Sequence, residues 1–267
     1  MRALVIYSIK RGLGIKKKWT AKITPIILYI AAFVPAVIVA GILAFVGDQV
    51  DFDYDDLCNF IEFTLLIYAA ALAPEMLCDD RRENVLSLYF SRALTRLDYL
   101  IAKVIAMAIL MGTIAFGPLL LLWGAKVLQA QDPIAYMFDH LTDVGRILVY
   151  GTLISAFFAA IGLGIAAYTN RKGIATGIFI GGVIFMTALA NALFSAIDSD
   201  ARRFLLFVSP MDIVRSLSLW LFGDFNGPDV NILIREADMP GITLAGAVLF
   251  VVAIAGLIMY RRYLTEE

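Results

Sequence analysis

The chain has 267 residues, of which 61% are hydrophobic and 17% are charged, and its formal net charge at pH 7 is −1. This composition predicts a polytopic membrane protein and excludes an ordinary water-soluble domain, in which about 25% of the residues are charged. A net charge so close to zero gives no reason to expect nucleic acid among its partners.

Residues 1–22 are predicted to form an amphipathic helix that lies at the membrane interface. Ile6, Ile9 and Leu13 fall on one helical face, lysines gather toward the end of the segment, and Trp19 suits the level of the lipid headgroups. The alternative is an ordinary basic flank of the first span, because two glycines in the segment weaken its helical propensity.

Six apolar stretches are long enough to cross about 30 Å of hydrocarbon, which takes about 20 helical residues. Thr24 is placed to cap the first of them, and Pro25 would occupy its first helical position. We therefore expect an all-α fold with six transmembrane helices in one domain that covers residues 1–267. In chain order, the six predicted spans are Ile26–Val46, Leu57–Leu77, Val104–Ala125, Ile147–Tyr168, Gly173–Ala196 and Gly241–Tyr260.

Lysine and arginine are concentrated on one side of this predicted bundle. Of the 22 basic residues, 16 lie before the first span, between the second and third, between the fourth and fifth, or after the last. Cationic loops resist translocation, so both termini are expected in the cytoplasm, and the protein in the plasma (inner) membrane. The acidic first loop, GDQVDFDYDD, agrees with an external position.

Two glutamates fall within the second predicted span, where an ionisable group is costly. Glu62 lies about one turn inside the outer face and is expected to reach the headgroups. Glu75 lies near the cytoplasmic end, at a depth similar to that of Lys103 on the following span. The two side chains either form a buried pair or extend separately to the surface.

A stretch too charged to lie in hydrocarbon follows the second span: DDRRENVLSLYFSRALTRLDYLIAK. In its loop, residues 79–98, Asp80 and Glu83 form a capping pair before a short apolar helix, and Thr95 with Asp98 signals the start of the next helix. We expect a short transverse helix, a corner and a fresh helix start, which together offer a surface to a cytoplasmic partner. The alternative is that the loop lies on the headgroups with its arginines bound to anionic lipid.

The fifth predicted span carries Gly173, Gly177 and Gly181 at a spacing of four residues. Such a stripe lets another helix approach closely and gain van der Waals contact that lipid does not supply. The approaching helix belongs either to a second subunit or to the same chain, and the sequence leaves both open.

An external segment, residues 197–240, separates the fifth span from the sixth. It contains SPMDIVRSLSLWLFG, in which Ser209 is a helix cap, Pro210 suits the first helical position and Gly223 is a stop signal. This pattern predicts a helix over residues 210–222 that lies on the outer interface or dips into it, because it is too short to span the membrane.

Motifs for chemistry are absent from the sequence. There is no G-x-x-x-x-G-K-[ST] phosphate-binding loop, and no H-E-x-x-H, G-x-S-x-G or C-x-x-C motif. The single histidine, His140, has Asp139 and Asp143 near it, but a solvated loop explains this grouping better than a metal site does. We therefore assign no catalytic residue and no metal ligand, and do not expect an enzyme.

The charged stretch after the second span, together with Glu75, resembles the first cytoplasmic loop of the ABC-2 type transporter permeases, whose usual form is close to E…D…E…TL…LSRP…SR…Y…GK. The sequence departs from that form at Asn84, Val85, Ala93 and Ala102. The resemblance covers the whole chain in topology and is specific in this loop, and SPMDIVRSL is also similar to the family's external segment. The matching positions are Glu75, Asp80, Glu83, Leu86, Leu88, Ser91, Arg92, Thr95, Arg96, Tyr99 and Lys103.

This resemblance implies the membrane subunit of an ABC exporter. In the family, two six-span subunits pair, as a homodimer or a heterodimer, and the N-terminal helix and first loop dock on a separate nucleotide-binding subunit, which holds ATP and Mg. No cofactor is then expected on this chain. The fifth-span glycines would lie at the dimer interface. The residues expected to couple the chain to the ATPase subunit are Asp80, Glu83, Leu88, Phe90, Arg92 and Arg96.

Two other function classes remain possible from the sequence. A membrane scaffold or assembly subunit would have the same composition, and a neighbouring reading frame with an ATPase motif would favour the permease over it. A secondary transporter driven by an ion gradient would show an internal repeat and acids near the bilayer midplane, and neither is evident. Scattered polar groups among many phenylalanines and methionines suit an apolar or amphipathic cargo.

Overall fold

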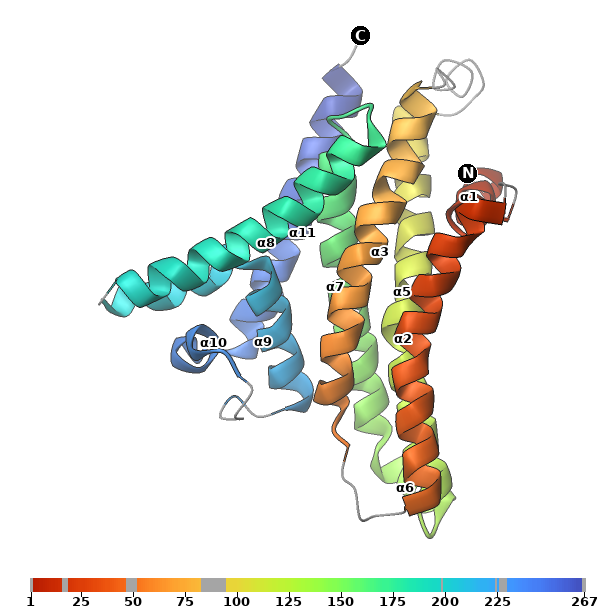
Figure 1. The fold of residues 1–267 in the computed structure, drawn as a ribbon, viewed down its shortest axis with the longest axis vertical. Helices are drawn as coiled ribbons and strands as arrows, with labels where there is room; N and C mark the ends of the chain where they lie inside the picture. The colour runs from red at the N-terminus through yellow and green to blue at the C-terminus, as the bar shows by residue number, and fades with distance from the viewer. Residues whose placement is uncertain are drawn as a thin grey trace.

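A computed structural model describes residues 2–15, 19–46, 52–82, 95–197, 199–223, 225 and 230–265. The described part of the chain is helical, with no strand (Figure 1). The elements are α1 (Arg2–Gly12), α2 (Trp19–Val46), α3 (Tyr54–Arg82), α5 (Arg96–Gln129), α6 (Pro133–Asp139), α7 (Leu141–Ala166), α8 (Lys172–Ala196), the 3-10 helix η2 (Asp200–Val208), α9 (Pro210–Phe222), α10 (Ile232–Ala237) and α11 (Gly241–Thr265).

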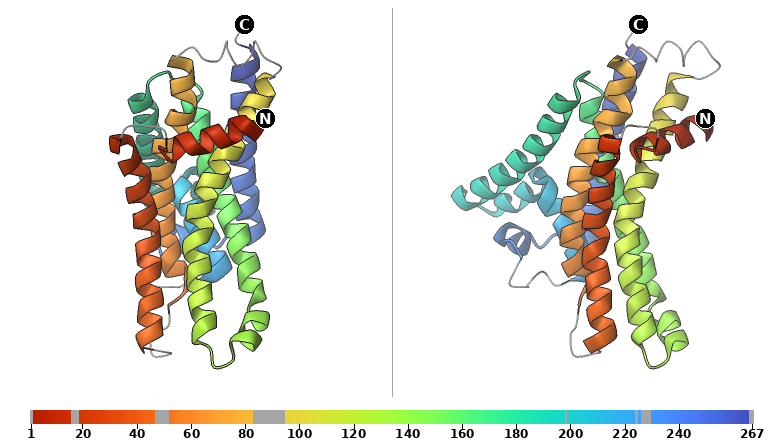
Figure 2. Two further views of the ribbon diagram at one scale, coloured as in Figure 1. Left: turned by 90° about the vertical axis from the view of Figure 1, so that its right-hand side faces the viewer. Right: turned by 45° about the vertical axis from the view of Figure 1, so that its right-hand side comes forward.

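The six expected spans are confirmed as helices long and apolar enough to cross a membrane: α2, α3, α5, α7, α8 and α11. All but α8 run side by side along the bundle, whereas α8 diverges from it at a large angle (Figure 1). The charged first helix, the start of α5 and the last turns of α11 lie at one end of the bundle (Figures 1 and 2). We call this the basic end, and the end that carries α6 the opposite end.

The predicted start of the first span is wrong. Helix α2 begins at Trp19, so Pro25 lies inside the helix and Thr24 is not its cap. A proline in a transmembrane helix removes one backbone hydrogen bond, which neighbouring groups in the bundle offset. By contrast, α5 begins where expected: Thr95 caps it and forms a capping box with Asp98.

Helix α3 forms the centre of the bundle although it is the least apolar of the six spans. In its most apolar stretch 72% of the residues are buried, compared with 22% in α2, α8 and α11. Lipid tails are as apolar as leucine, so a membrane bundle gains by placing its polar residues inside, where they find partners. The polar residues of α3 are therefore candidates for a functional site.

Helix α1 lies across the spans and packs on α5 and α3 (Figure 2, left). Its buried face consists of Leu4, Ser8 and Gly12, spaced four residues apart. The expected apolar face is wrong in one position, because Ile6 is 52% exposed and points away from the bundle. Gly12 allows the close approach, since no side chain would fit there without displacing Leu110.

The segment between α8 and α11 contains the expected helix with its expected ends. Ser209 caps α9, Pro210 is its first residue and Gly223 ends it. The chain turns by 101° between the end of η2 and α9. Helix α9 then packs against α3, α7, α8 and α11, with Val214 and Leu217 fully buried. It therefore enters the bundle and does not lie on its surface.

Replacing Gly12 tests whether α1 is packed closely on the bundle. A Cβ atom there would lie 2.6 Å from Leu110 Cδ1 and 2.8 Å from Leu72 Cδ1. Both atoms end flexible side chains, so Gly12→Ala should be accommodated, whereas Gly12→Leu should lower the free energy of unfolding by about 1–3 kcal/mol. Reversible unfolding in detergent micelles measures this, with Gly256→Leu, at an open position of α11, as the control. Equal stability of the two leucine variants would contradict the packing.

Candidate functional site

Two adjacent carboxylates, Asp79 and Asp80, lie in the last turn of α3 at the basic end. Their side chains are 6% and 0% exposed. A buried carboxylate is stable only where cations or hydrogen-bond donors surround it. The cations and hydrogen-bond donors around these two carboxylates come from several helices.

Asp80 is held by groups from α1 and α5. Lys103 Nζ lies 2.7 Å from Asp80 Oδ2, and the side chains of this ion pair are both 0% exposed. The hydroxyl of Tyr99 donates a hydrogen bond of 2.7 Å to the same oxygen. Arg11 Nη1 lies 2.5 Å from Asp80 Oδ1.

Asp79 is held by groups from α1, α8 and its own helix. Arg11 Nη2 lies 2.9 Å from its carboxylate, and Lys172 Nζ, at the start of α8, lies 2.7 Å from it. Arg82 is more distant, at 3.6 Å, and its side chain is 64% exposed. We call the group formed by Arg11, Asp79, Asp80, Tyr99, Lys103 and Lys172 the acid–base cluster; it joins four helices at one point.

Arg11 stays charged in this cluster. Burial alone would lower its pKa, but the hydrogen bond to Asp79 and the negative charges of Asp80 and Asp79 raise the pKa above its ordinary value. Arg11 bridges both carboxylates, so α1 is attached to the end of α3 by charge as well as by packing.

A second set of contacts attaches α7 and α11 to the same end of the bundle. Arg81 donates a hydrogen bond to the backbone carbonyl of Ala167, and its guanidinium lies 4.9 Å from the centre of the Tyr263 ring. Arg96 Nη1 donates to the Tyr263 carbonyl at 3.1 Å. Together with the acid–base cluster, these contacts join α1, α3, α5, α7, α8 and α11.

The acid–base cluster lies at the base of the loop that resembles the ABC-2 permeases. Helix α3 ends at Arg82 and α5 begins at Arg96. Of the expected coupling residues, Asp80 and Arg96 lie in these helices, whereas Glu83, Leu88, Phe90 and Arg92 lie outside the described residues. The bonds from Asp80 to Tyr99 and Lys103 hold the two ends of the loop together.

The partner of Lys103 differs from the one suggested by the sequence. Lys103 pairs with Asp80, and Glu75, one turn earlier in α3, lines a small pocket with Gly12, Thr24 and Tyr68. Arg11, Asp79 and Lys172 were not predicted as site residues. Arg11 lies 68 residues before Asp79 in the sequence, and Lys172 lies 93 residues after it, so no local pattern encodes their contacts.

Glu62 also differs from expectation, because it points into the bundle and not toward the headgroups. It is 2% exposed and accepts a hydrogen bond of 2.8 Å from Tyr150 on α7. Two helical turns before Glu62, Asp55 forms a two-pronged ion pair with Arg215 of α9, with both N–O distances 2.7 Å. These contacts fix α9 inside the opposite half of the bundle.

The three fifth-span glycines lie on the outward face of α8. No atom of a neighbouring element lies within 4 Å of a Cβ placed on Gly173, Gly177 or Gly181. A helix that packs against this face of α8 is therefore not one of the helices described in this chain.

The residues described contain no group of three or more His, Cys, Asp or Glu side chains that could hold a metal ion. His140 lies with its ring stacked on that of Tyr136, at 3.9 Å between the ring centres. No protein-family model matches the chain, and no curated protein matches it. A functional assignment therefore depends on the site and on the loop sequence.

The pair between Asp80 and Lys103 makes a quantitative prediction about stability. Asp80→Asn leaves Lys103 buried without its counter-ion, so it should lower the free energy of unfolding by about 3–5 kcal/mol. Adding Lys103→Met to that variant should restore part of the loss. Unfolding in detergent micelles measures both changes.

The matched control is Asp143→Asn, which breaks an ion pair with Arg146 whose arginine side chain is 54% exposed and whose N–O distance is 3.5 Å. It should cost less than about 1 kcal/mol. If Asp80→Asn cost no more than this control, the acid–base cluster would not be a strong constraint on the fold.

Proposed function

We propose that the chain is the transmembrane permease subunit of an ATP-driven ABC-2 type exporter. In this proposal it forms the substrate pathway as a dimer and is coupled to a separate ATPase subunit. The observation that carries the proposal is the position of the acid–base cluster. Asp80, Tyr99 and Lys103 all belong to the loop pattern that resembles the family, and they bond to one another across the base of the loop.

The mechanism requires a rigid connection between the loop and the spans. A partner that pushes on the loop moves the membrane helices only if the loop's ends do not give way first. Asp80 ties the end of α3 to the start of α5, and the capping box of Thr95 and Asp98 stabilises the first turn of α5. In this role Leu88 and Phe90 fill an apolar groove on the ATPase subunit, and Arg92 bonds to its polar groups.

The same proposal gives α1 a role as an interfacial helix. It lies across the bundle at the basic end, and Arg11 joins it to both carboxylates at the end of α3 (Figure 2). With the basic end in the cytoplasm, as the distribution of lysine and arginine predicts, both termini, α1 and the loop face the ATPase subunit. The membrane is then the plasma (inner) membrane.

ATP and Mg bind to the partner in this proposal, because this sequence has no phosphate-binding loop. The second permease subunit is placed against α8. The support is the open face around Gly173, Gly177 and Gly181, where no described helix of the chain approaches. Small residues on an outward face allow the backbones of two helices to come close together.

One observation favours an ion-driven secondary transporter as a second candidate. Glu62 and Tyr150 form a buried pair of titratable groups inside the bundle, and such groups serve as proton relays in transporters. The two candidates differ in their energy source. Transport by the permease requires the ATPase subunit and ATP, whereas transport by the second candidate requires an ion gradient and neither of these.

The coupling role of the loop predicts a separation of assembly from transport. Leu88→Asp and Arg92→Glu should leave membrane insertion intact but abolish binding of the ATPase subunit or uncouple ATP hydrolysis from transport. The measurements are co-purification with the ATPase subunit, and ATP-dependent uptake of lipids, drugs and peptides into inverted vesicles.

Two controls match these variants in chemistry but lie at the opposite end of the bundle. Leu128 is 82% exposed at the end of α5, and Arg146 is 54% exposed in the first turns of α7. Leu128→Asp and Arg146→Glu should preserve binding and transport. Full partner binding and full transport by both loop variants would overturn the proposed coupling.

Pairing of two permease subunits predicts that bulk on the outward face of α8 weakens the dimer. Gly177→Leu with Gly181→Leu should reduce subunit crosslinking in the membrane, since each leucine keeps the facing backbone at a distance. Gly246→Leu, at an open position of α11, is the control and should leave pairing unchanged. Crosslinking that survives the double replacement would remove α8 from the interface.

A further inference from the structure

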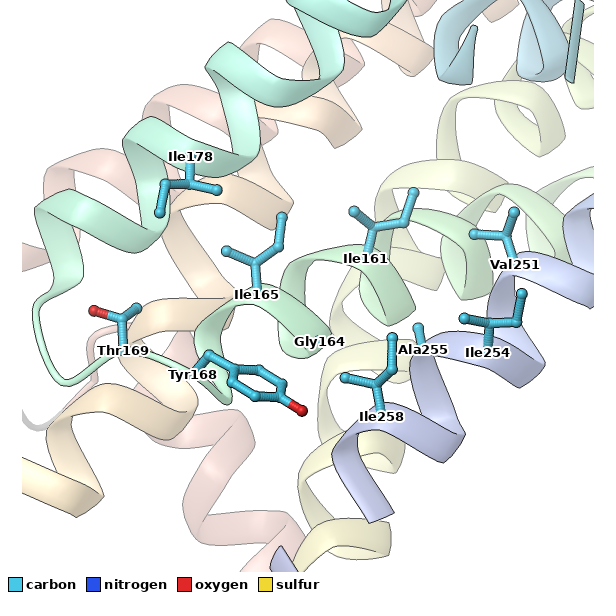
Figure 3. Close-up of a pocket in the computed structure, with 10 residues that line it drawn as sticks. All are labelled: Ile161, Gly164, Ile165, Tyr168, Thr169, Ile178, Val251, Ile254, Ala255 and Ile258. Carbon is cyan, nitrogen blue, oxygen red and sulfur yellow. The ribbon is translucent and has the colours of Figure 1, made fainter. Parts of the chain in front are cut away.

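An apolar groove of about 580 Å³ lies between α7, α8 and α11 (Figure 3). Its volume falls in the range of about 300–1,000 Å³ that is typical of ligand sites. Isoleucines make its walls: Ile161 and Ile165 from α7, Ile178 from α8, and Ile254 and Ile258 from α11. Ile178 and Ile254 are exposed on the surface of their membrane-spanning helices, so a ligand would reach the groove from the hydrocarbon.

The groove is present because small residues bring α7 and α11 close together while α8 diverges from both. A Cβ on Gly164 of α7 would lie 3.6 Å from the Cβ of Ala255 on α11, which brings these two helices close together. Helix α8 departs from both of them as it leaves the α7–α8 turn (Figure 1). Small residues therefore form the floor of the groove, whereas the longer isoleucine side chains form its walls.

The polar groups of the groove are gathered at one end. Tyr168 and Thr169, at the end of α7, line the groove where it reaches the basic end (Figure 3). The guanidinium of Arg262 lies 5.3 Å from the centre of the Tyr168 ring, in a cation–π contact. Arg262 is one helical turn beyond Ile258, so it continues the stripe of α11 that lines the groove. The site thus changes from purely apolar to cationic along its length.

We propose that this groove binds one acyl chain of an anionic glycerophospholipid, with the lipid phosphate at Arg262. The chain lies against the isoleucine walls, and the phosphate accepts hydrogen bonds from the Arg262 guanidinium and the Thr169 hydroxyl. From Val251 to Ile258 the groove extends over seven residue steps of α11, about 10 Å at 1.5 Å per residue. It therefore holds the part of the acyl chain nearest the headgroup.

The charge at the end of the groove favours a lipid over a second copy of the chain. At the basic end of the groove, α8 begins at Lys172 and α11 carries Arg262 in its last turn. A second copy seated in the groove would bring like charges together at Arg262. An anionic headgroup provides the opposite charge at the same depth, as basic pockets between membrane helices commonly require. The inference is independent of whether the protein transports anything.

The test is native mass spectrometry of the full-length protein, titrated with phosphatidylglycerol or phosphatidylcholine that carry identical acyl chains. One phosphatidylglycerol should bind about fivefold more tightly than phosphatidylcholine, the gain expected from one arginine near the headgroup. Arg262→Gln should make the two affinities equal. Ile258→Trp should fill the groove and weaken binding of both lipids at this site.

Two matched controls should bind lipid as the unaltered protein does. Leu249→Trp adds the same side chain to the opposite face of α11, where Leu249 is 56% exposed, and Arg146→Gln removes a cation at the opposite end of the bundle. A preference for phosphatidylglycerol that survives Arg262→Gln would overturn the headgroup site. Unchanged lipid binding with a reduced dimer fraction in Ile258→Trp would show that the groove is a subunit interface and overturn the proposal.

Discussion

Two neighbouring carboxylates, buried at the end of the central helix, impose the main constraint on this fold. Asp79 and Asp80 lie in the last turn of α3, where the helix dipole already places partial negative charge, so their ionised forms are doubly disfavoured. The closest compensating charges are cations brought from other helices. Arg11, Lys103 and Lys172 are such cations, and each comes from a different helix. Ion pairs as well as apolar packing therefore hold the helices of the basic end around α3.

Polar contacts also determine which helix occupies the centre and which ones diverge. Helix α3 carries Asp80 near one end, and Asp55 and Glu62 near the other, and each finds its partner on a different neighbour. A helix with such residues gains most from the interior, which is why the least apolar span is the most buried. Among the described residues, the polar contacts of α8 with α3 come from its first two turns, through Lys172 and Thr176, and its polar contact with α9 lies near its end, through Asn191. Because of this attachment, the glycine face of α8 points outward, and a groove lies between α8, α7 and α11.

Local sequence signals predicted the helices well, because those signals act over a few residues. The six apolar spans, the capping box at Thr95 and the limits of α9 at Ser209 and Gly223 all depend on patterns of this kind. Partners across the bundle were not predictable in the same way. Pairing of Lys103 with Asp80, and the inward position of Glu62, depend on which helix packs beside α3, and no short pattern in the sequence carries that information.

The ion pairs that join the helices at the basic end differ in strength. Under the proposed function, this difference determines which helices would move together. The pair between Asp80 and Lys103 excludes solvent completely, with both side chains 0% exposed, so α3 and α5 behave as one unit around the loop. Lys172 is 36% exposed where it meets Asp79, and a solvent-exposed pair is worth less. Helix α8 is thus held by the weakest of these ion pairs. Under the proposed function, a load on the loop would first displace α8 from α3, and α8 carries both the glycine face and one wall of the apolar groove.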